Sequence, residues 1–301
     1  MRHPIRFGLK VSCEDITASE MRSCWRIADE AGFDHLWDFD HLAGVKGDDG
    51  PNHSIFDGWA LLAAMAQATK RVHIGCLVTG NTYRHPAVLA KLAVTVDHLS
   101  GGRLEFGIGA GHAAIEHRMY GIDGLEHRVG RLSESLQVLK VLWTQDRCNF
   151  DGRYYRLHDA IANPKPLQRP HPPIWIGARG DTTLKLAARH ADVWNVTVRG
   201  NASAAEDAKA AGLLGLRLQE ECERQGRDPA EVRWSGQVFW DGRDRSRLAS
   251  DVGAYLDQGF TEIVIFPDVR ATGADPVVAA SAAAEELDAL RRLRAPEPAG
   301  A

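Results

Sequence analysis

The sequence predicts an α/β protein, a (β/α)8 or TIM barrel, from three observations. A short apolar run, a polar or glycine-rich connector and an amphipathic stretch of helical period recur almost to the end of the chain, which is typical of βα units around a parallel sheet. The apolar runs number about eight, which is the number of strands that closes such a barrel. A chain of 301 residues, 44% of them hydrophobic, fits one large barrel.

The expected elements follow one another in regular alternation. The expected strands are residues 5–11, 35–40, 72–79, 104–110, 173–178, 192–196, 232–238 and 261–266. The expected helices are residues 19–31, 58–69, 87–98, 128–143, 182–190, 204–225, 245–258 and 276–293. Gly32, Gly101 and Gly259 follow three of these helices, where we expect left-handed helix caps and not ligand contacts.

Two segments interrupt the alternation. Residues 43–56 are rich in Gly, Asp and Asn, which predicts a loop over the carboxyl ends of the strands. Residues 148–172 contain too many prolines for a helix, so we expect an irregular insertion before strand five, within about residues 146–172. We therefore expect a single barrel domain over residues 1–294 and a disordered tail over 295–301.

Composition excludes several classes of function. With 36 basic and 40 acidic residues the net charge is −4, which argues against a nucleic-acid surface and favours a small-molecule ligand. The five cysteines are scattered without a CxxC pair and indicate reduced thiols. The amino terminus runs straight into a strand, and no stretch is apolar enough to cross a membrane. A cytoplasmic location is expected.

Candidate site residues are those at the carboxyl ends of the strands, because barrel active sites lie there. They are Asp38, Asp40 and His41 after strand two, residues 78–81 after strand three, residues 109–112 after strand four and residues 177–181 after strand five. A carboxylate next to His41 can fix its tautomer for acid–base work, and His112 occupies the equivalent place two strands later. Either could equally be a loop histidine. His35 and the nearby Asp and His residues lack helix-borne metal-ligand spacing, so no metal site is expected.

Two glycine-rich stretches need separate interpretations. GIGAGH, residues 107–112, lacks the last glycine of a dinucleotide fingerprint; its small residues either pack inside the barrel or let a flat ring approach. The loop Gly177–Gly180 leads into a helix near Asp181 and offers backbone N–H groups and Arg179 to a phosphate. Trp37, Trp59, Trp143 and Trp175 fit the core, whereas Tyr83, Tyr154 and Tyr155 lie in connectors and could line a pocket. Hydrolase and NTPase motifs are absent.

Three stretches together carry a family resemblance: VTGNTYRHPAVLAKLAVTVDHLSGGRLEFGIGAG, EHRMYG and NPKPLQRPHPPIWIGARGDTTLKLAARHADVWN. Their order and spacing resemble the bacterial luciferase-like superfamily, and more narrowly its actinobacterial oxidoreductases that depend on coenzyme F-420 (F420). The resemblance runs from about Phe33 to Asn195. The last third of the chain resembles the family only in its rhythm of strands and helices.

The resemblance implies a cofactor ring in the barrel mouth, against a bulge at residues 77–79 where relatives often hold a cis non-proline bond. The implied cofactor-binding residues are Asp40, His41, Leu77, Val78, Thr79, Asn81, Gly109, Ala110, Gly111 and, for the phosphate, Gly177, Ala178, Arg179 and Gly180. His41 matches a histidine that assists proton handling during hydride transfer. At the His112 position several relatives carry a glutamate acid, so either His112 replaces that acid as proton donor or the substrate geometry differs.

The expected function is hydride transfer between coenzyme F-420 and a small organic substrate, with His41 and His112 as catalytic residues. An FMN-dependent luciferase-like monooxygenase that uses reduced flavin and oxygen is the first alternative, because the superfamily contains many enzymes of this type. A barrel that binds flavin without catalysis is the second. The resemblance also implies a homodimer. No substrate code is recognisable in the segments expected to form the pocket walls.

Overall fold

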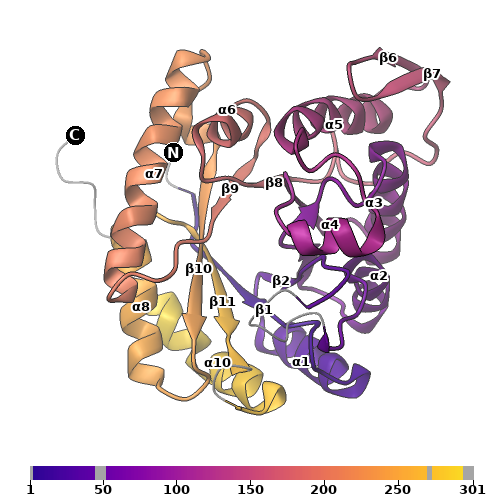
Figure 1. Ribbon diagram of the computed structural model, residues 1–301. Helices are drawn as coiled ribbons and strands as arrows, with labels where there is room; N and C mark the ends of the chain where they lie inside the picture. Colours follow the sequence, from indigo (N-terminus) through magenta and orange to yellow (C-terminus); the bar gives the residue numbers. More distant parts are fainter. Residues whose placement is uncertain (1–2, 45–51, 270–272, 294–301) are drawn as a thin grey trace. The chain divides into compact units, whose positions relative to one another are not determined.

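The computed structural model describes residues 3–44, 52–269 and 273–293 (Figure 1). The chain forms two compact units. The first contains the described residues up to Val11, Thr17–Trp37 and those from Ala178 onward; the second contains Ser12–Ile16 and the described residues of Asp38–Gly177. Each unit is described by itself below, and a single domain over residues 1–294 stays a prediction.

The first unit is a parallel sheet with helices. Its strands lie in the order β2-β1-β11-β10-β9, with β1 at Arg6–Lys10, β2 at His35–Asp38, β9 at Val193–Val196, β10 at Arg233–Trp240 and β11 at Glu262–Pro267. Its helices are α1 (Ala18–Ala31), α6 (Asp181–His190), α7 (Ala204–Arg224), α8 (Arg245–Asp257) and α10 (Pro276–Arg292), and a 3-10 turn, η2, spans Pro229–Glu231. In this unit α1 packs on α10, and α7 packs on both α6 and α8.

The second unit repeats the same arrangement. β5 (Leu104–Gly109) lies between β8 (Ile174–Gly177) on one side and β3 (His73–Cys76) with its continuation β4 (Thr79–Gly80) on the other, all parallel. The helices are α2 (Gly58–Ala68), α3 (Pro86–Ser100), α4 (Ala114–Tyr120) and α5 (Arg128–Thr144). Counting β3 and β4 as one, the described chain has eight parallel strands that alternate with helices, so the fold is the predicted (β/α)8 barrel.

Local sequence explains where the helices begin and end. Thr17 and Glu20 form a capping box at the start of α1. Gly32 (φ 86°) and Gly101 (φ 68°) end α1 and α3 in the left-handed conformation, and Gly259 (φ 90°) follows α8, so all three predicted glycine caps are confirmed.

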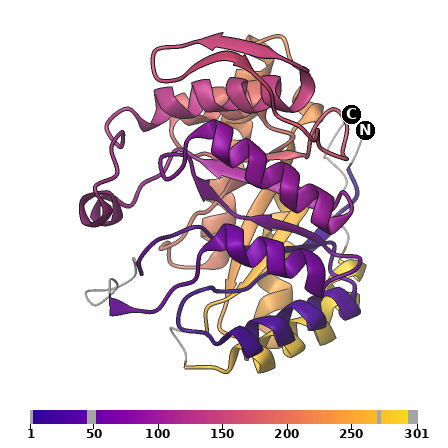
Figure 2. The ribbon, with the colours of Figure 1, turned by 90° about the vertical axis from the view of Figure 1, so that its right-hand side faces the viewer.

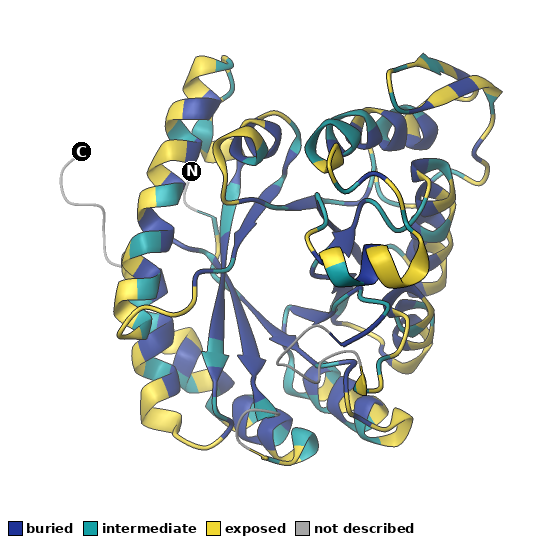
Figure 3. Cartoon of the chain, in the orientation of Figure 1, coloured by how far each residue is buried: buried dark blue, intermediate teal, exposed yellow. Residues whose placement is uncertain are grey.

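The core lies along the strands and the inner faces of the helices. Figure 3 shows that the strands of the parallel sheet are almost wholly buried and that the helices carry one buried and one exposed face. All six residues of β5 are buried. Trp37, Trp59, Trp143 and Trp175 are buried as well, which confirms that these four belong to the core.

The insertion before the fifth barrel strand is more regular than its prolines predict. β6 (Cys148–Asp151) and β7 (Arg156–Ala160) form an antiparallel hairpin, which lies against α5 (Figures 1 and 2). The Glu134 side chain on α5 accepts hydrogen bonds from the backbone N–H groups of Arg153, Tyr154 and Tyr155 in the hairpin turn. The prolines fall after the hairpin, so they do not prevent its cross-strand bonds.

Some expectations concern residues that are only partly described. Residues 45–51 of the predicted loop and the tail 295–301 lie outside the described residues.

All five cysteines are free and buried, as the absence of a CxxC pair predicts. Within the described ranges, no helix has the length and apolar character of a membrane span.

Candidate functional site

The centre of the candidate site is the bulge between β3 and β4 in the second unit. The Leu77–Val78 peptide bond is cis, as the family resemblance predicts. The Val78 side chain covers two glycines, because a Cβ would lie 2.8 Å from Val78 Cγ2 at Gly109 and 3.3 Å from it at Gly177. At Gly111 (φ 87°) a Cβ would lie 2.7 Å from Thr82 Oγ1. These contacts fit the packing interpretation of Gly109 and Gly111 in GIGAGH, and their contact with a cofactor ring stays a prediction.

His41 follows β2 and is held by Glu116 of α4. His41 Nδ1 lies 2.9 Å from Glu116 Oε2, and the Tyr83 hydroxyl donates to the same oxygen. The other carboxylate oxygen accepts from the backbone N–H groups of Leu42 (2.6 Å) and Ala43 (3.0 Å). The Glu116 side chain is fully buried, whereas 16% of the His41 side chain is exposed. His41 Nε2 makes no hydrogen bond within the described chain.

Glu116 is a carboxylate and not a neutral acid. Burial alone would favour the protonated form, but hydrogen bonds from His41, Tyr83 and the Ala43 backbone outweigh it and bring the pKa of Glu116 to about 2. Because an ionised carboxylate only accepts hydrogen bonds, Nδ1 of His41 must carry the proton of this contact. In the neutral ring Nε2 is then an acceptor.

His112 lies beside His41, as the sequence predicts. The two rings are 5.5 Å apart in an edge-to-face arrangement, and His112 is exposed. Burial of part of the ring and the neighbouring His41 lower the pKa of His112. A third histidine, His117, is buried and bonded to Thr82 Oγ1 and to the Ala113 carbonyl oxygen, both at 2.8 Å. His117 is therefore a packing residue.

Two of the predicted cofactor residues have buried polar atoms that no described residue satisfies. Asp40 Oδ2 pairs with Arg84 at 2.6 Å, and Arg84 also pairs with Asp57, but Asp40 Oδ1 has no hydrogen-bond partner in the described chain. Both polar side-chain atoms of Asn81 also lack one, although only 1% of that residue is exposed. Burial raises the pKa of Asp40, and Arg84 opposes this rise. Unsatisfied buried polar atoms are rare, and a bound ligand or a water molecule can supply the missing partner.

The remaining predicted cofactor residues lie either in the core or in the loop that leads into α6. The Thr79 hydroxyl accepts a hydrogen bond from Trp59 Nε1 at 3.0 Å and belongs to the core. The loop residues Ala178, Arg179 and Gly180 belong to the first unit.

The predicted phosphate loop has the features that bind an anion. α6 begins at Asp181, directly after Gly180, and no side chain caps its first turn. Ala178 is fixed by a backbone bond to Asn195 O (3.1 Å) and by Trp194 Nε1, which donates to its carbonyl oxygen (2.8 Å). The next residue, Arg179, is exposed. Although the first-turn Asp181 is already paired with Arg217, free N–H groups, the helix dipole and Arg179 fit a phosphate group.

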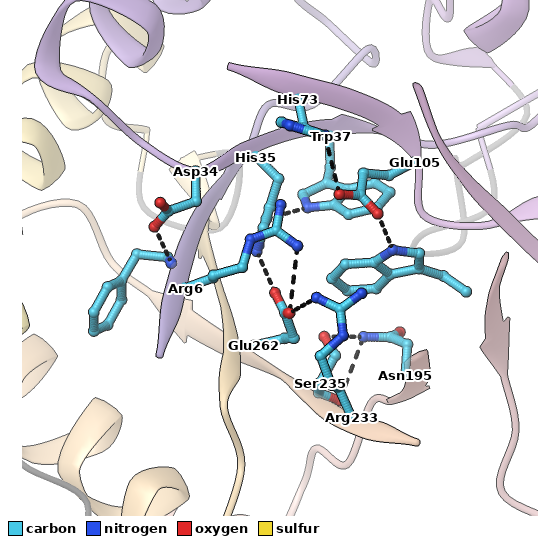
Figure 4. Close-up of polar contacts among 12 residues, drawn as sticks. Arg6, Asp34, His35, Trp37, His73, Glu105, Asn195, Arg233, Ser235 and Glu262 are labelled. Carbon is cyan, nitrogen blue, oxygen red and sulfur yellow. Dashed lines mark hydrogen bonds and ion pairs between the residues drawn. The ribbon is translucent and has the colours of Figure 1, made fainter. Parts of the chain in front are cut away.

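A second polar cluster lies in the first unit, at the start of β2 (Figure 4). His35 Nε2 lies 3.0 Å from Glu262 Oε2, and Trp37 Nε1 donates to His35 Nδ1 at 2.6 Å. Glu262 also pairs with Arg6 and Arg233. Both ring nitrogens of His35 thus have protein partners, so His35 fits a structural role.

Sequence reasoning missed Glu116 and the helix that carries it. α4 has only seven residues and no side-chain cap at its start, so it gives a weak signal of helical period. Gly121 (φ 63°) ends it in the left-handed conformation, and this glycine at the end of EHRMYG was the one local signal of a helix.

Comparison with known proteins identifies the class. Residues 3–256 match the family described as luciferase-like monooxygenase. An F420-dependent glucose-6-phosphate dehydrogenase of Nakamurella multipartita is 32% identical over 279 residues, which are 91% of this chain and 77% of the relative. An FMNH(2)-dependent dimethylsulfone monooxygenase of Pseudomonas putida is 32% identical over 225 residues, 70% of this chain and 60% of the relative. This chain belongs to the luciferase-like monooxygenase family.

The solved structures confirm the fold. An F420-dependent secondary alcohol dehydrogenase in complex with an F420-acetone adduct superposes with a TM-score of 0.80 at 19% identity, over 96% of this chain and 99% of that one. Three further relatives named F420-dependent glucose-6-phosphate dehydrogenase match over only 56%, 58% and 66% of their own length.

Proposed function

We propose that this protein is an oxidoreductase that depends on coenzyme F420 and transfers a hydride between the deazaflavin and a small organic substrate. The observation that carries the proposal is the buried Glu116 carboxylate that holds His41 after β2, in the same unit as the Leu77–Val78 bulge. Relatives named F420-dependent glucose-6-phosphate dehydrogenase support the choice of cofactor.

The residues present fit such a cofactor. Asp40 Oδ1 and the Asn81 amide, which lack partners in the described chain, offer hydrogen bonds to a polar ring edge. In the first unit, Gly180 and Arg179 at the start of α6 have the features that suit a phosphate group. A bound deazaflavin supplies a carbon centre that accepts or donates a hydride, and the protein binds it, orients it and excludes water.

His41 handles the proton. With Nδ1 bonded to Glu116, Nε2 is free to take the hydroxyl proton of an alcohol when that alcohol is oxidised to a carbonyl compound. In the reverse direction the same nitrogen returns the proton. Glu116 stabilises the imidazolium that forms and fixes the orientation of the ring.

His112 is a less available proton donor than an ordinary histidine. Its pKa is lowered from an ordinary value near 6.5, so the ring is mostly neutral at pH 7. We therefore assign to His112 a hydrogen bond to the substrate and not the donation of a proton. Of the two possibilities given by the family resemblance, a different substrate geometry is therefore favoured over replacement of the glutamate acid by His112.

A second candidate is an FMN-dependent monooxygenase, and the relative named FMNH(2)-dependent dimethylsulfone monooxygenase favours it. A barrel that binds flavin without catalysis is the third. It would keep the loop Gly177–Gly180 and tolerate replacement of His41 without any change in turnover.

The deciding experiment is a pair of fluorescence titrations of the purified apoprotein, one with F420 and one with FMN. We expect F420 to bind at least about tenfold more tightly, a difference of about 1.4 kcal/mol. A preference for FMN would make the monooxygenase the leading function. Failure to bind either cofactor would contradict all three candidates.

The setting of the enzyme is also proposed. The five cysteines, none of which forms a disulfide, favour the cytoplasm, and the family resemblance favours a homodimer. Cell fractionation and analytical ultracentrifugation of the purified protein test these two points. A monomer at micromolar concentration would contradict the second.

A further inference from the structure

Two arginines and a histidine lie close to the ring of Tyr154 in the second unit. The guanidinium carbons of Arg131 and Arg153 lie 5.3 Å and 5.4 Å from the centre of the Tyr154 ring. The His127 ring lies 5.8 Å from it at an interplanar angle of 35°. Arg128 follows His127 directly and donates only to the Leu125 carbonyl oxygen. We call His127, Arg128, Arg131 and Arg153 the Tyr154 cluster.

The side chains of the Tyr154 cluster form no ion pair within the described chain. Arg131 Nε is also buried there without a hydrogen-bond partner. The nearby carboxylates are used elsewhere: Glu134 binds the backbone of the hairpin turn, and Asp151 pairs with Arg156. Three arginines beside the single carboxylate of Glu134 keep an excess of positive charge, which a bound anion would offset.

The start of α5 strengthens this argument. The helix begins at Arg128, its first turn contains no acidic residue, and no side chain caps it. Cations at this end are opposed by the helix dipole, which favours anions. Arg128 and Arg131 therefore stand where a helix normally favours acidic residues, and His127 is the N-cap residue. Departures from such local preferences are expected at functional sites.

The cluster is also built to a fixed shape. A Cβ at Gly124 (φ 98°) would lie 2.4 Å from Arg131 Nε, and one at Gly130 would lie 2.8 Å from Tyr154 Cε2. These two glycines therefore let the guanidinium and the ring approach the backbone closely. Glu134 fixes the hairpin turn that carries Arg153 and Tyr154.

The cluster follows the candidate site along the chain, since α4, which carries Glu116, ends at Tyr120 and α5 begins at Arg128. We infer that the Tyr154 cluster is a second anion site, which takes a phosphate or carboxylate group of the substrate or of the cofactor. The assignment to substrate or cofactor rests on the proposed function, whereas the anion site itself does not. If the cluster takes the substrate, the preferred substrate is an anionic molecule.

The test compares a double variant, Arg131→Gln with Arg153→Gln, with the matched control Arg156→Gln on the same hairpin. Inorganic phosphate is titrated into each apoprotein by calorimetry. We expect the affinity of the Tyr154 cluster for phosphate to fall at least about tenfold in the double variant. The control should bind phosphate as wild type does. If the double variant does not fold, as judged by circular dichroism, Arg128→Gln replaces it.

A second titration separates the two sources of the anion. Each protein is titrated with anionic F420 and with 5-deazariboflavin, which has no charged group. A tenfold loss for F420 alone assigns the cluster to the cofactor, whereas unchanged F420 binding with weakened phosphate binding assigns it to the substrate. The inference is overturned if phosphate and F420 both bind the cation variants as they bind wild type. Failure of wild type to bind F420 would refute the proposed function alone, because the phosphate titration needs no cofactor.

Discussion

Two histidine–glutamate pairs, one in each unit, use the same groups in opposite ways. His35 and Glu262 are both completely buried, and both ring nitrogens of His35 have partners. His41 is partly exposed and bonded to its glutamate through Nδ1 only. The number of ring nitrogens in use, and not the presence of a carboxylate, separates a structural histidine from one that can move a proton.

The tautomers are opposite as well. Trp37 donates to Nδ1 of His35, so Nε2 must carry the proton that faces Glu262. His41 carries its proton on Nδ1, facing Glu116. The first arrangement leaves no acceptor on the ring, and the second leaves Nε2 as an acceptor.

Replacing His41 should have the largest effect on activity. His41→Gln removes the group assigned to proton transfer, so we expect kcat to fall about 10²- to 10⁴-fold. The melting temperature should change little, because the ring is partly exposed. Steady-state kinetics with F420 and a substrate found by screening measure the first quantity. His35→Gln is the matched control. If both variants lose kcat equally while remaining folded, the His41 and His35 pairs do not differ in function.

Replacing Glu262 should have the largest effect on stability. Glu262→Gln leaves Arg6, Arg233 and His35 around a neutral group, and removing one partner from a buried ion pair costs about 3–5 kcal/mol. Urea unfolding measures this loss of unfolding free energy. We expect F420 affinity of the folded fraction to remain at the wild-type value. A loss under about 0.5 kcal/mol, the range of ordinary surface substitutions, would contradict a structural role.

The two pairs also show how much of the fold and of the candidate site could be predicted from the sequence. Apolar runs and glycine caps predicted the eight barrel strands to within a few residues, because burial and left-handed caps are local signals. The partner of His41 was not predictable in this way, since Glu116 is 75 residues away in sequence. The cis bond at Leu77–Val78 came from family resemblance and not from local pattern.

The roles of the predicted site residues differ in how far the structure bears on them. Asp40 and Asn81 have buried atoms without partners in the described chain, and His41 is bonded there through Nδ1 only, which fits the predicted ligand contacts. Gly109 and Gly177 are explained by the packing of Val78. The catalytic role of His112 stays a prediction.

Replacing Glu116 should have an intermediate effect. Glu116→Gln keeps the size of the side chain and removes the charge that fixes the His41 tautomer, so we expect kcat to fall by about tenfold or more, with F420 affinity within about twofold of wild type. Imidazole ¹⁵N NMR should show a greater share of the Nε2–H tautomer in the variant. Tyr83→Phe is the control, because it removes one donor to Glu116 and leaves the His41 contact. An unchanged tautomer and unchanged kcat would refute a positioning role.

The smallest expected effect is a pH dependence of stability. The pKa of Glu116 falls from an ordinary 4.5 in the unfolded chain to about 2 in the folded protein. A lowered folded-state pKa stabilises the protein fully above about pH 4.5, and this contribution declines as pH falls toward 2. The difference in unfolding free energy between wild type and Glu116→Gln should therefore be constant from pH 7 to 5 and shrink below it. Urea unfolding across this range measures it, and a difference that grows below pH 4.5 would mean that Glu116 is protonated in the folded protein and that its bonds to His41 and Tyr83 do not hold it as a carboxylate.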